Sequence, residues 1–562
     1  MISQRLTSQR GMALFIALML TLMISIIGIG IIKTSNDEVT IAGNELQEMV
    51  AFYTAEAGLE KAAAALQTYY EVHGLSPSTM PAGTESLASA TIAYVTNDMG
   101  PYATKKLTEG AFTGLNASVK TYSIQSIGTS LIDGSQVSLT QEFDCALVPI
   151  FQWAVFYKDE LWVEPVYDMN LDGRVHSNGN MYVRSASAGA TMLFEDRVTC
   201  GGDLINGFPW AGSKGPVQFT DKDGNHIDQK QDGNWIDAAY ANKYQSYDTW
   251  FEASTALWGG MVRDQSFGEK PLNLPLSGSG DAHKLIERAD GGNVDSYENK
   301  ADLKILDGVP YSWNGSAWID IAASLPAGTI KQDASVEFYD HKEKKQVRNT
   351  QIDVGLLSTS AYFPNNGIIY VSDQLSGSYI NGTTLVNGDD LNGKPMTVAC
   401  ENPVYIQGDF NTQDKQPAAV MTDAMYFLSN NWNYANSTEF SSLSSRIPTA
   451  TEANVSFITG DVAPDIAASN HQGGLENLPR FLEDWRGKEL KIRGSMIQMW
   501  RSQQAIGDYT YGQYYTAPSR NWGFDTDLSD PSKLPPGTPS VRVFQRMGWK
   551  QEYVGIATSE SN

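Results

Sequence analysis

The sequence predicts an α+β protein, in which one long N-terminal helix spans a membrane and a mainly β region follows it. Three observations support this prediction. Residues 12–32 are apolar and uncharged, apolar positions at helical spacing continue beyond them, and short apolar runs between Gly and Asn turns fill the chain from residue 151 onward. We expect the last region to fold as a right-handed parallel β-helix, with a two-sheet β-sandwich as the alternative.

The apolar stretch from Met12 to Ile32 is long enough to cross a bilayer, because at about 1.5 Å of rise per residue it reaches roughly 30 Å. A cleavable secretory signal has a shorter apolar region, of about 7 to 15 residues, followed by a small-residue cleavage site. Here the polar sequence TSNDEVT follows instead. Arg5 and Arg10 precede the stretch and acidic residues follow it, so the positive-inside rule places the N-terminus in the cytoplasm and the bulk of the chain across the membrane.

The same helix is expected to continue beyond the membrane over residues 12–74. No proline occurs between Met1 and Gly74, Gly74 suits the left-handed position after a helix, and Pro77 blocks continuation. Apolar residues recur at intervals of three and four at Val39, Ala42, Leu46, Met49, Tyr53 and Ala57. The prediction is a rod that is apolar at one end and amphipathic at the other.

Three stretches carry a family resemblance: QRGMALFIALML, IKTSNDEVTIAGNE and AFYTAEAGLEKA. Together they closely resemble the N-terminal region of PilX-like minor pilins, which are type IV pilin-like subunits of Gram-negative bacteria. The resemblance implies that residues 1–11 are a prepilin leader. A prepilin peptidase on the cytoplasmic face is then expected to cut after Gly11 and to methylate the new N-terminus at Met12, while the helix stays as the anchor.

The fifth residue of that mature chain is Ile16. Major pilins usually have a glutamate at this position, where its carboxylate pairs with the N-terminal amine of a neighbouring subunit in a medium in which unpaired charge is costly. PilX-like proteins commonly lack this acid. The resemblance therefore implies a minor structural subunit, at the tip or active in assembly, rather than the repeating subunit of the fibre.

The resemblance also implies location and partners. Before assembly the chain is expected to cross the inner membrane once with its C-terminal domain in the periplasm, and after assembly to lie in an extracellular pilus at the cell surface. Its expected partners are major and minor pilins, the pilus assembly platform and the prepilin peptidase, with a host or surface ligand as a further partner. A pilus and a secretion pseudopilus both remain open, as does the position in the filament.

Composition argues against nucleic acid as a partner. The chain has 40 Lys and Arg residues against 64 Asp and Glu residues, a formal net charge of −24, and this charge repels phosphate backbones. Its three cysteines, Cys145, Cys200 and Cys400, are too few for a disulfide framework, and the sequence does not identify a pair.

Residues 75–150 are expected to form a small β region packed on the helix. The runs TYSIQSI and VSLTQEF alternate apolar and polar residues on either side of Asp133-Gly134, which predicts a β-hairpin. In residues 151–562, YSWNGSAWID reads as a second hairpin on an Asn-Gly turn. We expect its Trp313 and Trp318 to pack across the strands, with stacking on a sugar as the alternative. The run LENLPRFLEDW predicts a short amphipathic helix.

No local motif for catalysis is present. The sequence contains no HExxH, no GxxxxGK[ST] and no GxSxG, and its six histidines never have helical metal-ligand spacing. His176, in VHSNGN, is expected to be a hydrogen-bonded turn or core residue. We therefore predict that the protein is not an enzyme. Some β-helix proteins cleave polysaccharides with carboxylate pairs, so a membrane-anchored polysaccharide-active enzyme stays as an alternative.

One acidic loop is a candidate calcium site. In TDKDGNHIDQKQDGNWID, clustered oxygen ligands are supplied by Asp221, Asp223, Asn225, Asp228 and Asp232. A solvated turn is the competing interpretation. A second stretch, DMNLDGR, matches only half of an EF-hand loop, because Gly179 stands where the spacing requires glutamate. No other cofactor is expected.

Three functions thus remain: a structural subunit of a type IV pilus or related filament, a sugar-binding adhesin displayed on that filament, and an anchored enzyme. The N-terminal region favours the first, and the adhesin is compatible with it.

Overall fold

The computed structural model describes residues 5–73, 76–108, 112–187, 189–209, 212–239, 245, 247–272, 281–289, 293, 295–464 and 474–554. The chain divides into two compact units. The first unit comprises Met1–Ala103, Val119–Ala146 and Val543–Asn562, and the second comprises Thr104–Ser118 and Leu147–Arg542. A long helix and many strands confirm the predicted α+β class.

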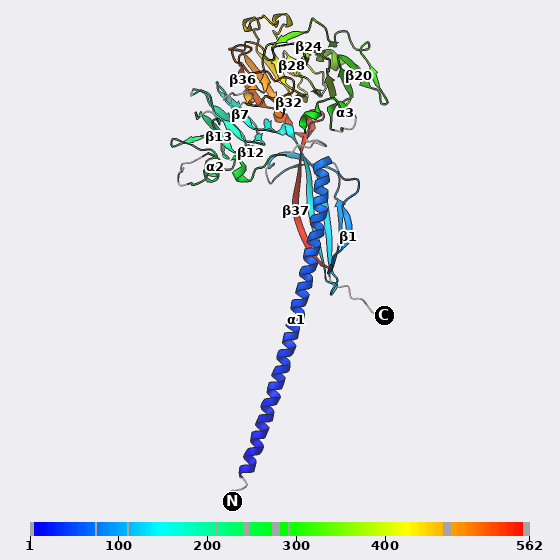
Figure 1. Cartoon of the computed structure of the whole chain (residues 1–562), viewed down its shortest axis with the longest axis vertical. Coiled ribbons are helices and arrows are strands. Elements are labelled where there is room, and N and C mark those ends of the chain that lie inside the picture. The colour runs from blue at the N-terminus through cyan, green and yellow to red at the C-terminus, as the bar shows by residue number, and fades with distance from the viewer. Residues whose placement is uncertain are drawn as a thin grey trace. The chain divides into compact units, whose positions relative to one another are not determined.

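The first unit is built on helix α1 (Arg5–His73), which confirms the long helix expected from the sequence. Residues 11–46 of α1 are exposed, apart from the half-buried Gly28, whereas the second half of the helix lies along a sheet (Figure 1). Its buried positions recur at helical spacing: Ala51, Thr54, Ala55, Gly58, Leu59, Ala62, Ala63, Leu66 and Tyr70. One face of the amphipathic half therefore forms the core of this unit.

The sheet of the first unit has the strand order β1-β2-β4-β5-β37, with β3 paired to β4. Its strands are β1 (Ala82–Ser86), β2 (Ala90–Asp98), β3 (Ala103–Lys106), β4 (Asn116–Ser130), β5 (Gln136–Pro149) and β37 (Ser540–Val554). Strands β4 and β5 flank a turn in which Gly134 adopts a φ of 78°, so the hairpin predicted at Asp133-Gly134 is confirmed. Burial alternates along β4 from Tyr122 to Ser130, where every second residue is buried.

Two glycines let α1 approach this sheet closely. A Cβ on Gly128 in β4 would lie 2.0 Å from the carbonyl oxygen of Ala51 and 2.5 Å from the amide nitrogen of Ala55. A Cβ on Gly58 in α1 would lie 2.4 Å from Ile92 and from Ser126. Backbone therefore packs directly against backbone at Gly128, where no larger residue fits.

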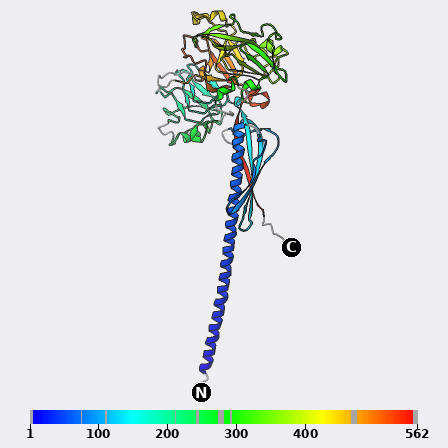
Figure 2. The ribbon, with the colours of Figure 1, turned by 45° about the vertical axis from the view of Figure 1, so that its right-hand side comes forward.

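The final strand of this sheet comes from the C-terminus of the chain. In β37, the ring of Phe544 stacks on Phe143 of β5 at 5.2 Å between centroids, and Arg546 Nη2 donates to Glu60 of α1 at 2.6 Å. Figure 1 and Figure 2 show β37, in red, beside the other strands. The sequence analysis places residues 540–554 in the large β region of residues 151–562. The structure corrects this placement, because β37 pairs with β5 in the sheet of the first unit. The reason is that strand pairing depends on distant partners, which local sequence does not reveal.

The second unit contains three sets of mainly parallel strands, of which the first is continuous. Its order from β18 to β19 is parallel throughout, and β20 and β21 follow β19 antiparallel. The strands, in spatial order, are β18 (Val262–Arg263), β12 (Val198–Cys200), β9 (Val175–Ser177), β6 (Val155–Tyr157), β35 (Met496–Arg501), β32 (Ser456–Asp461), β29 (Ala418–Thr422), β27 (Met396–Cys400), β25 (Ile368–Ser372), β19 (Leu303–Leu306), β20 (Val309–Trp313) and β21 (Trp318–Asp320).

The other two sets are each divided into two sheets. The second set consists of β13 (Leu204–Asn206), β10 (Met181–Val183) and β7 (Leu161–Val163), and, separately, β22 (Ile330–Lys331), β24 (Lys345–Asp353) with β23 (Phe338–Asp340), β26 (Ile380–Val386), β28 (Val404–Gln407), β30 (Met425–Leu428) and β33 (Pro479–Arg480). The third set consists of β15 (His226–Asp228), β14 (Val217–Thr220), β11 (Met192–Phe194) and β8 (Met169–Leu171), and, separately, β31 (Thr451–Asn454), β34 (Glu489–Gly494) and β36 (Ser519–Phe524). In these sets β22 and β23 pair with β24, and β15 pairs with β14, in the antiparallel direction.

Shorter elements complete the described part of the second unit. They are the hairpin β16 (Lys230–Gln231) and β17 (Asn234–Trp235), the helices α2 (Trp250–Trp258), α3 (Tyr297–Lys300) and α4 (Val354–Thr359), and the 3₁₀ turns η1 (Ile150–Gln152), η2 (Gln265–Phe267), η3 (Ala282–Leu285), η4 (Tyr434–Asn436), η5 (Leu443–Ser445), η6 (Leu475–Asn477), η7 (Thr526–Ser529) and η8 (Pro531–Lys533).

The route of the chain through the first set explains how the second unit begins and ends. The chain enters at β6, in the middle of the set, and proceeds outward through β9 and β12 to β18. It resumes at β19 at the opposite end and returns through β25, β27, β29 and β32 to β35, which pairs with β6. We call the junction between the first turn of chain (β6 to β8) and the last (β35 to β36) the seam.

From β6 to β14 successive strands pass through the three sets in turn, and from β25 to β30 they alternate between the first and second sets. The pairing between these successive turns of chain is parallel, as expected for stacked coils. β-Sandwiches are built instead from antiparallel sheets. The right-handed winding of a parallel β-helix stays a prediction.

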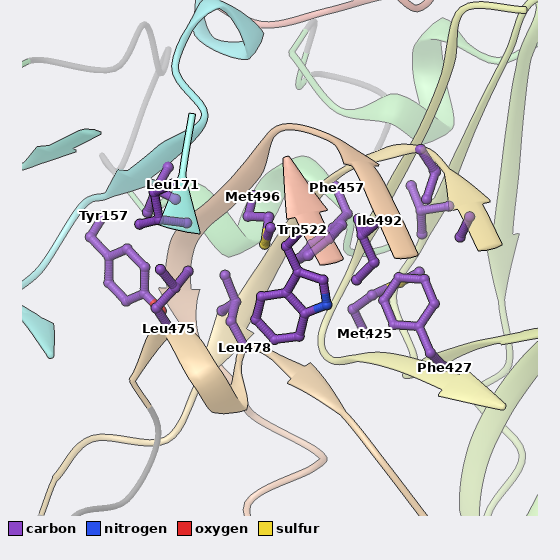
Figure 3. Close-up of a cluster of buried hydrophobic side chains, with 14 of the residues drawn as sticks. Tyr157, Leu171, Met425, Phe427, Phe457, Leu475, Leu478, Ile492, Met496 and Trp522 are labelled. Atoms are coloured by element: carbon purple, nitrogen blue, oxygen red, sulfur yellow. The ribbon is translucent and has the colours of Figure 1, made fainter. Parts of the chain in front are cut away.

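The interior of the second unit is filled by apolar side chains from all three sets. Figure 3 shows one region of this core, in which Met496 of β35, Phe457 of β32 and Trp522 of β36 lie near one another. Leu475 in η6 and Leu478, the residue after η6, reach into the same core. The seam is therefore closed by a continuous apolar interior.

Two local predictions have different outcomes. The hairpin on YSWNGSAWID is confirmed, because β20 and β21 pair with Trp313 opposite Trp318 and their rings lie 5.5 Å apart. The helix predicted for LENLPRFLEDW is wrong, because only η6 forms before β33 begins at Pro479. A helix through this stretch would need an amide N–H at Pro479, which proline lacks. The apolar residues expected on its inner face are nevertheless buried: Leu475, Leu478, Phe481 and Leu482.

Candidate assembly helix and ligand cavity

The first half of α1 presents an apolar surface that no other described part of the chain covers. Residues Gly11–Glu71 include a segment of mean hydropathy 2.7, long and apolar enough to cross a membrane by length and composition. The large apolar side chains that are at least half exposed include Met12, Leu14, Phe15, Ile16, Leu18, Leu20, Leu22, Met23, Ile24, Ile26, Ile27, Ile29, Ile31 and Ile32. Such a surface is stable in a lipid bilayer or against other apolar helices.

The hydroxyl groups in this segment are hydrogen-bonded inside the helix itself. Thr21 Oγ1 donates to the carbonyl oxygen of Ala17 at 3.0 Å, and Ser25 Oγ donates to that of Thr21 at 2.8 Å. A hydroxyl in hydrocarbon must find a partner, and these find one without another subunit. The few polar residues are thus compatible with a membrane.

The predicted processing residues lie on this exposed surface. A Cβ on Gly11 would meet no heavy atom within 4 Å, so packing within the chain does not require glycine at this position. Met12 and Ile16 follow on the same helix and are 61% and 54% exposed. The roles expected for Gly11, Met12 and Ile16 stay predictions.

A comparison of the sequence with models of protein families finds a match that falls on this helix. The PilX N-terminal model matches residues 10–60, which include both the apolar half of α1 and the start of the half that packs on the sheet. The chain is a type IV pilin-like protein with a large C-terminal domain. Pilins assemble with other pilins, and the apolar helix fits membrane anchoring before assembly.

Comparisons over the whole pilin-like chain add little. A comparison with curated proteins finds no match. Among solved structures, the chain is similar to the competence-associated pilin ComZ from Thermus thermophilus, at 10% sequence identity over 90% of this chain and 98% of that chain, with a TM-score of 0.23. At that TM-score the similarity carries no argument about the fold.

Carboxylate oxygens of the candidate calcium loop accept hydrogen bonds from nearby groups of the protein. Asp221 Oδ1 accepts hydrogen bonds from the backbone N–H groups of Asp223 and Asn225, both at 2.8 Å, and Asp228 Oδ1 accepts one from Gln218 Nε2 at 2.9 Å. Asp232 is exposed. Among the described residues, no three His, Cys, Asp or Glu side chains are grouped as a metal site. This geometry gives the calcium prediction no support, and calcium binding stays untested.

Other residues singled out in the sequence have structural roles. His176 is buried, and its ring nitrogens hydrogen-bond to Thr199 Oγ1 at 2.7 Å and Asn178 Oδ1 at 3.0 Å. Burial lowers the pKa of His176 to about 4, so it is neutral at physiological pH. The three cysteines are free and buried.

The second unit has a cavity at the seam, which we call the seam cavity. Strand β7 ends one sheet of the second set and β33 ends the other, so this set is interrupted where the first set continues from β6 to β35. Glu164 and Tyr167 follow β7, Glu476 lies in η6 just before β33, and residues 509–520 complete the lining. The cavity encloses about 300 Å³, which is near the lower end of small-molecule sites, roughly 300–1,000 Å³.

Tyrosines form much of its wall. Tyr509 Oη donates to the backbone oxygen of Asn477 at 2.9 Å, and Tyr515 Oη donates to Asn477 Oδ1 at 3.1 Å. Tyr511 packs edge-on against Tyr515 at 6.0 Å between centroids. Tyr511 and Tyr167 are 56% and 58% exposed, so two rings stand at the rim while two are anchored inside.

Charged groups of both signs line the same cavity. Glu164 forms an ion pair with Arg184, and its backbone N–H donates to Glu476 Oε2 at 3.3 Å. Arg520 Nη2 donates to the backbone oxygen of Glu476 at 3.4 Å, and its guanidinium lies over the Trp522 ring at 5.2 Å. Burial lowers the pKa of Arg520, and the nearby carboxylate of Glu476 opposes that effect.

Sequence reasoning missed this cavity. The available signal was the density of tyrosines in YTYGQYY, residues 509–515. The signal is weak, because the cavity also needs Glu164, Tyr167 and Glu476, which are distant in the sequence and meet only through the pairing of β6 with β35.

Proposed function

We propose that this pilin-like protein is a minor structural subunit of a type IV pilus or related filament. The observation that carries the proposal is the match of residues 10–60 to the PilX N-terminal model on a helix whose first half is apolar and exposed. In a filament, that half packs against the helices of major and minor pilins. Before assembly it anchors the chain in the inner membrane, with the large domain in the periplasm.

Processing precedes assembly in this proposal. The prepilin peptidase removes residues 1–11 by cutting after Gly11 and methylates Met12. The open space around Gly11 supports a requirement for glycine that comes from the peptidase rather than from packing.

The subunit is rare and lies at or near the tip, or acts in initiating assembly. Ile16 supports this placement, because it offers no carboxylate to pair with the amine of a neighbouring subunit. The size of the second unit, Thr104–Ser118 with Leu147–Arg542, also supports it, since repeating so large a domain at each subunit of a thin fibre is sterically difficult.

Immunogold labelling of the second unit on sheared filaments tests this placement. We expect gold particles at filament ends, and we expect deletion of the gene to reduce filament number or adhesion while the major pilin persists. Regular labelling along the shafts would show that the chain is a repeating subunit.

The large domain acts in adhesion rather than catalysis in this proposal. One alternative is that the domain is a sugar-binding module displayed on the filament. A less favoured alternative is that it is a polysaccharide-active enzyme. The seam cavity supports the binding module, because its tyrosines are anchored by Asn477 and its carboxylates are engaged with neighbouring groups. Incubation with polysaccharides distinguishes the two, since a binding module leaves chain length unchanged.

A further inference from the structure

We propose that the seam cavity binds a neutral carbohydrate, with Tyr167 and Tyr511 as stacking platforms and Glu476, Asn477 and Arg520 as hydrogen-bonding groups. The proposal extends the adhesion role given above and rests on it only for display of the site on a filament. Binding to purified protein is therefore independent of whether the chain enters a filament.

The exposed rings of Tyr167 and Tyr511 provide the apolar part of the site. Sugar rings have apolar C–H faces that pack on aromatic rings, and an aromatic side chain provides a large apolar area with few rotatable bonds. Tyr511 is held in place by its edge-on contact with the buried Tyr515. The site is thus formed before a ligand arrives, which lowers the entropic cost of binding.

The polar groups meet the needs of sugar hydroxyls, each of which both donates and accepts hydrogen bonds. Glu476 is 6% exposed and its carboxylate is an acceptor. Arg520 lines the same cavity, and its guanidinium carries only donors. Acceptor and donor therefore lie in one small cavity beside aromatic rings.

The charge balance selects a neutral ligand. Each carboxylate of the lining has a guanidinium nearby: Glu164 is paired with Arg184, and the carboxylate of Glu476 acts electrostatically on Arg520. In the cavity, an acidic sugar would meet the carboxylates of Glu164 and Glu476, and a cationic ligand would meet the guanidinium of Arg520. The volume of about 300 Å³ suits a terminal sugar rather than a long segment of a chain.

The test uses the full chain purified in a detergent without a sugar head group, so that the detergent does not compete. Saturation-transfer NMR is recorded with glucose, galactose, mannose, N-acetylglucosamine and N-acetylgalactosamine, and with glucuronic acid and N-acetylneuraminic acid as acidic probes. Isothermal titration then measures the affinity of each sugar that binds. We expect at least one neutral sugar to bind and the acidic probes not to bind.

Two variants at the rim locate the site. Tyr167→Ala and Tyr511→Ala should each weaken binding of the neutral sugar about tenfold, because each removes one stacking platform. Both rings are more than half exposed, so the melting temperature should not change. Tyr379→Ala is the matched control, because Tyr379 is 40% exposed and does not line the cavity.

Three results would overturn the inference: no neutral sugar binds the wild-type chain, the acidic probes bind more tightly than the neutral ones, or both rim variants bind the sugar as tightly as the Tyr379→Ala control.

Discussion

At the scale of single residues, Gly128 shows how closely helix α1 and its sheet approach. The nearest atoms to an added Cβ are the backbone oxygen of Ala51, at 2.0 Å, and the backbone nitrogen of Ala55, at 2.5 Å. Backbone cannot rotate away as a side chain can. The glycine is therefore needed for packing within the first unit.

Gly128→Ala should destabilise the first unit by about 1–3 kcal/mol, because the methyl group forces the helix and the sheet apart. Gly43→Ala is a matched control within α1, since a Cβ there meets no atom within 4 Å and alanine favours the helix by roughly 1 kcal/mol. Thermal unfolding of the two variants checks the prediction, and equal melting temperatures would contradict it.

His283 is a second residue with a specific consequence. Its Nδ1 lies 2.7 Å from Glu287 Oε1 and its Nε2 lies 3.3 Å from Asp423 Oδ1. Burial alone would lower the pKa of His283, but the two carboxylates outweigh burial and raise it. The charged imidazole thus stabilises the folded state below its ordinary pKa, about 6.5, and this contribution is lost as the pH rises through the raised value.

The variant His283→Asn should therefore lower the melting temperature more at about pH 5.5 than at about pH 9, because only the acidic condition has a charged imidazole to lose. Comparing variant with wild type at each pH cancels the titration of other groups, such as Glu483, whose pKa burial raises to about 7. An equal loss of melting temperature at both pH values would show that the ion pairs with Glu287 and Asp423 contribute nothing.

At the scale of elements, strand β37, which begins at Ser540, completes a sheet whose first strand begins at Ala82. It pairs with β5 at the end of the order β1-β2-β4-β5-β37. Without it, β5 becomes an edge strand with unpaired backbone groups, and Phe143 loses the stacked ring of Phe544.

A chain truncated after Arg542 should show faster amide hydrogen exchange in β5, because the amides of an edge strand are exposed to water. Arg546→Ala is the control within β37: its ion pair with Glu60 is about half exposed, so its loss should cost no more than ~1 kcal/mol. Unchanged exchange in β5 of the truncated chain would mean that β37 does not protect this strand.

The same elements show where local sequence suffices to predict structure. Helix α1 was predictable because its spacing, the absence of proline and Gly74 are all local signals, and the hairpin of β4 and β5 because alternation flanks Asp133-Gly134. The membership of β37 in the first sheet was not predictable, because its pairing partner is distant. At LENLPRFLEDW the apolar spacing indicated a helix, but Pro479 prevents one.

At the scale of the whole molecule, the order of the strands explains why the seam cavity could not be predicted from the sequence. The runs from residue 151 onward indicated stacked coils, but not that the chain starts at β6 in the middle of the set and returns to it at β35. Glu164, from the first turn of chain, and Arg520, from the last, line one cavity at that junction. The resemblance to pilins, in contrast, was readable from the first 60 residues, because the basic N-terminus, the apolar span and the amphipathic pattern are contiguous there.

The central claim, that this chain is processed and assembled as a pilin-like subunit, is tested most directly at its N-terminus. Mass spectrometry of the protein from sheared filament fractions should find a mature chain that begins with N-methylated Met12. An intact Met1 terminus, or a chain cut beyond Ile32, would contradict the claim, because either result would separate the apolar helix from the prepilin pathway.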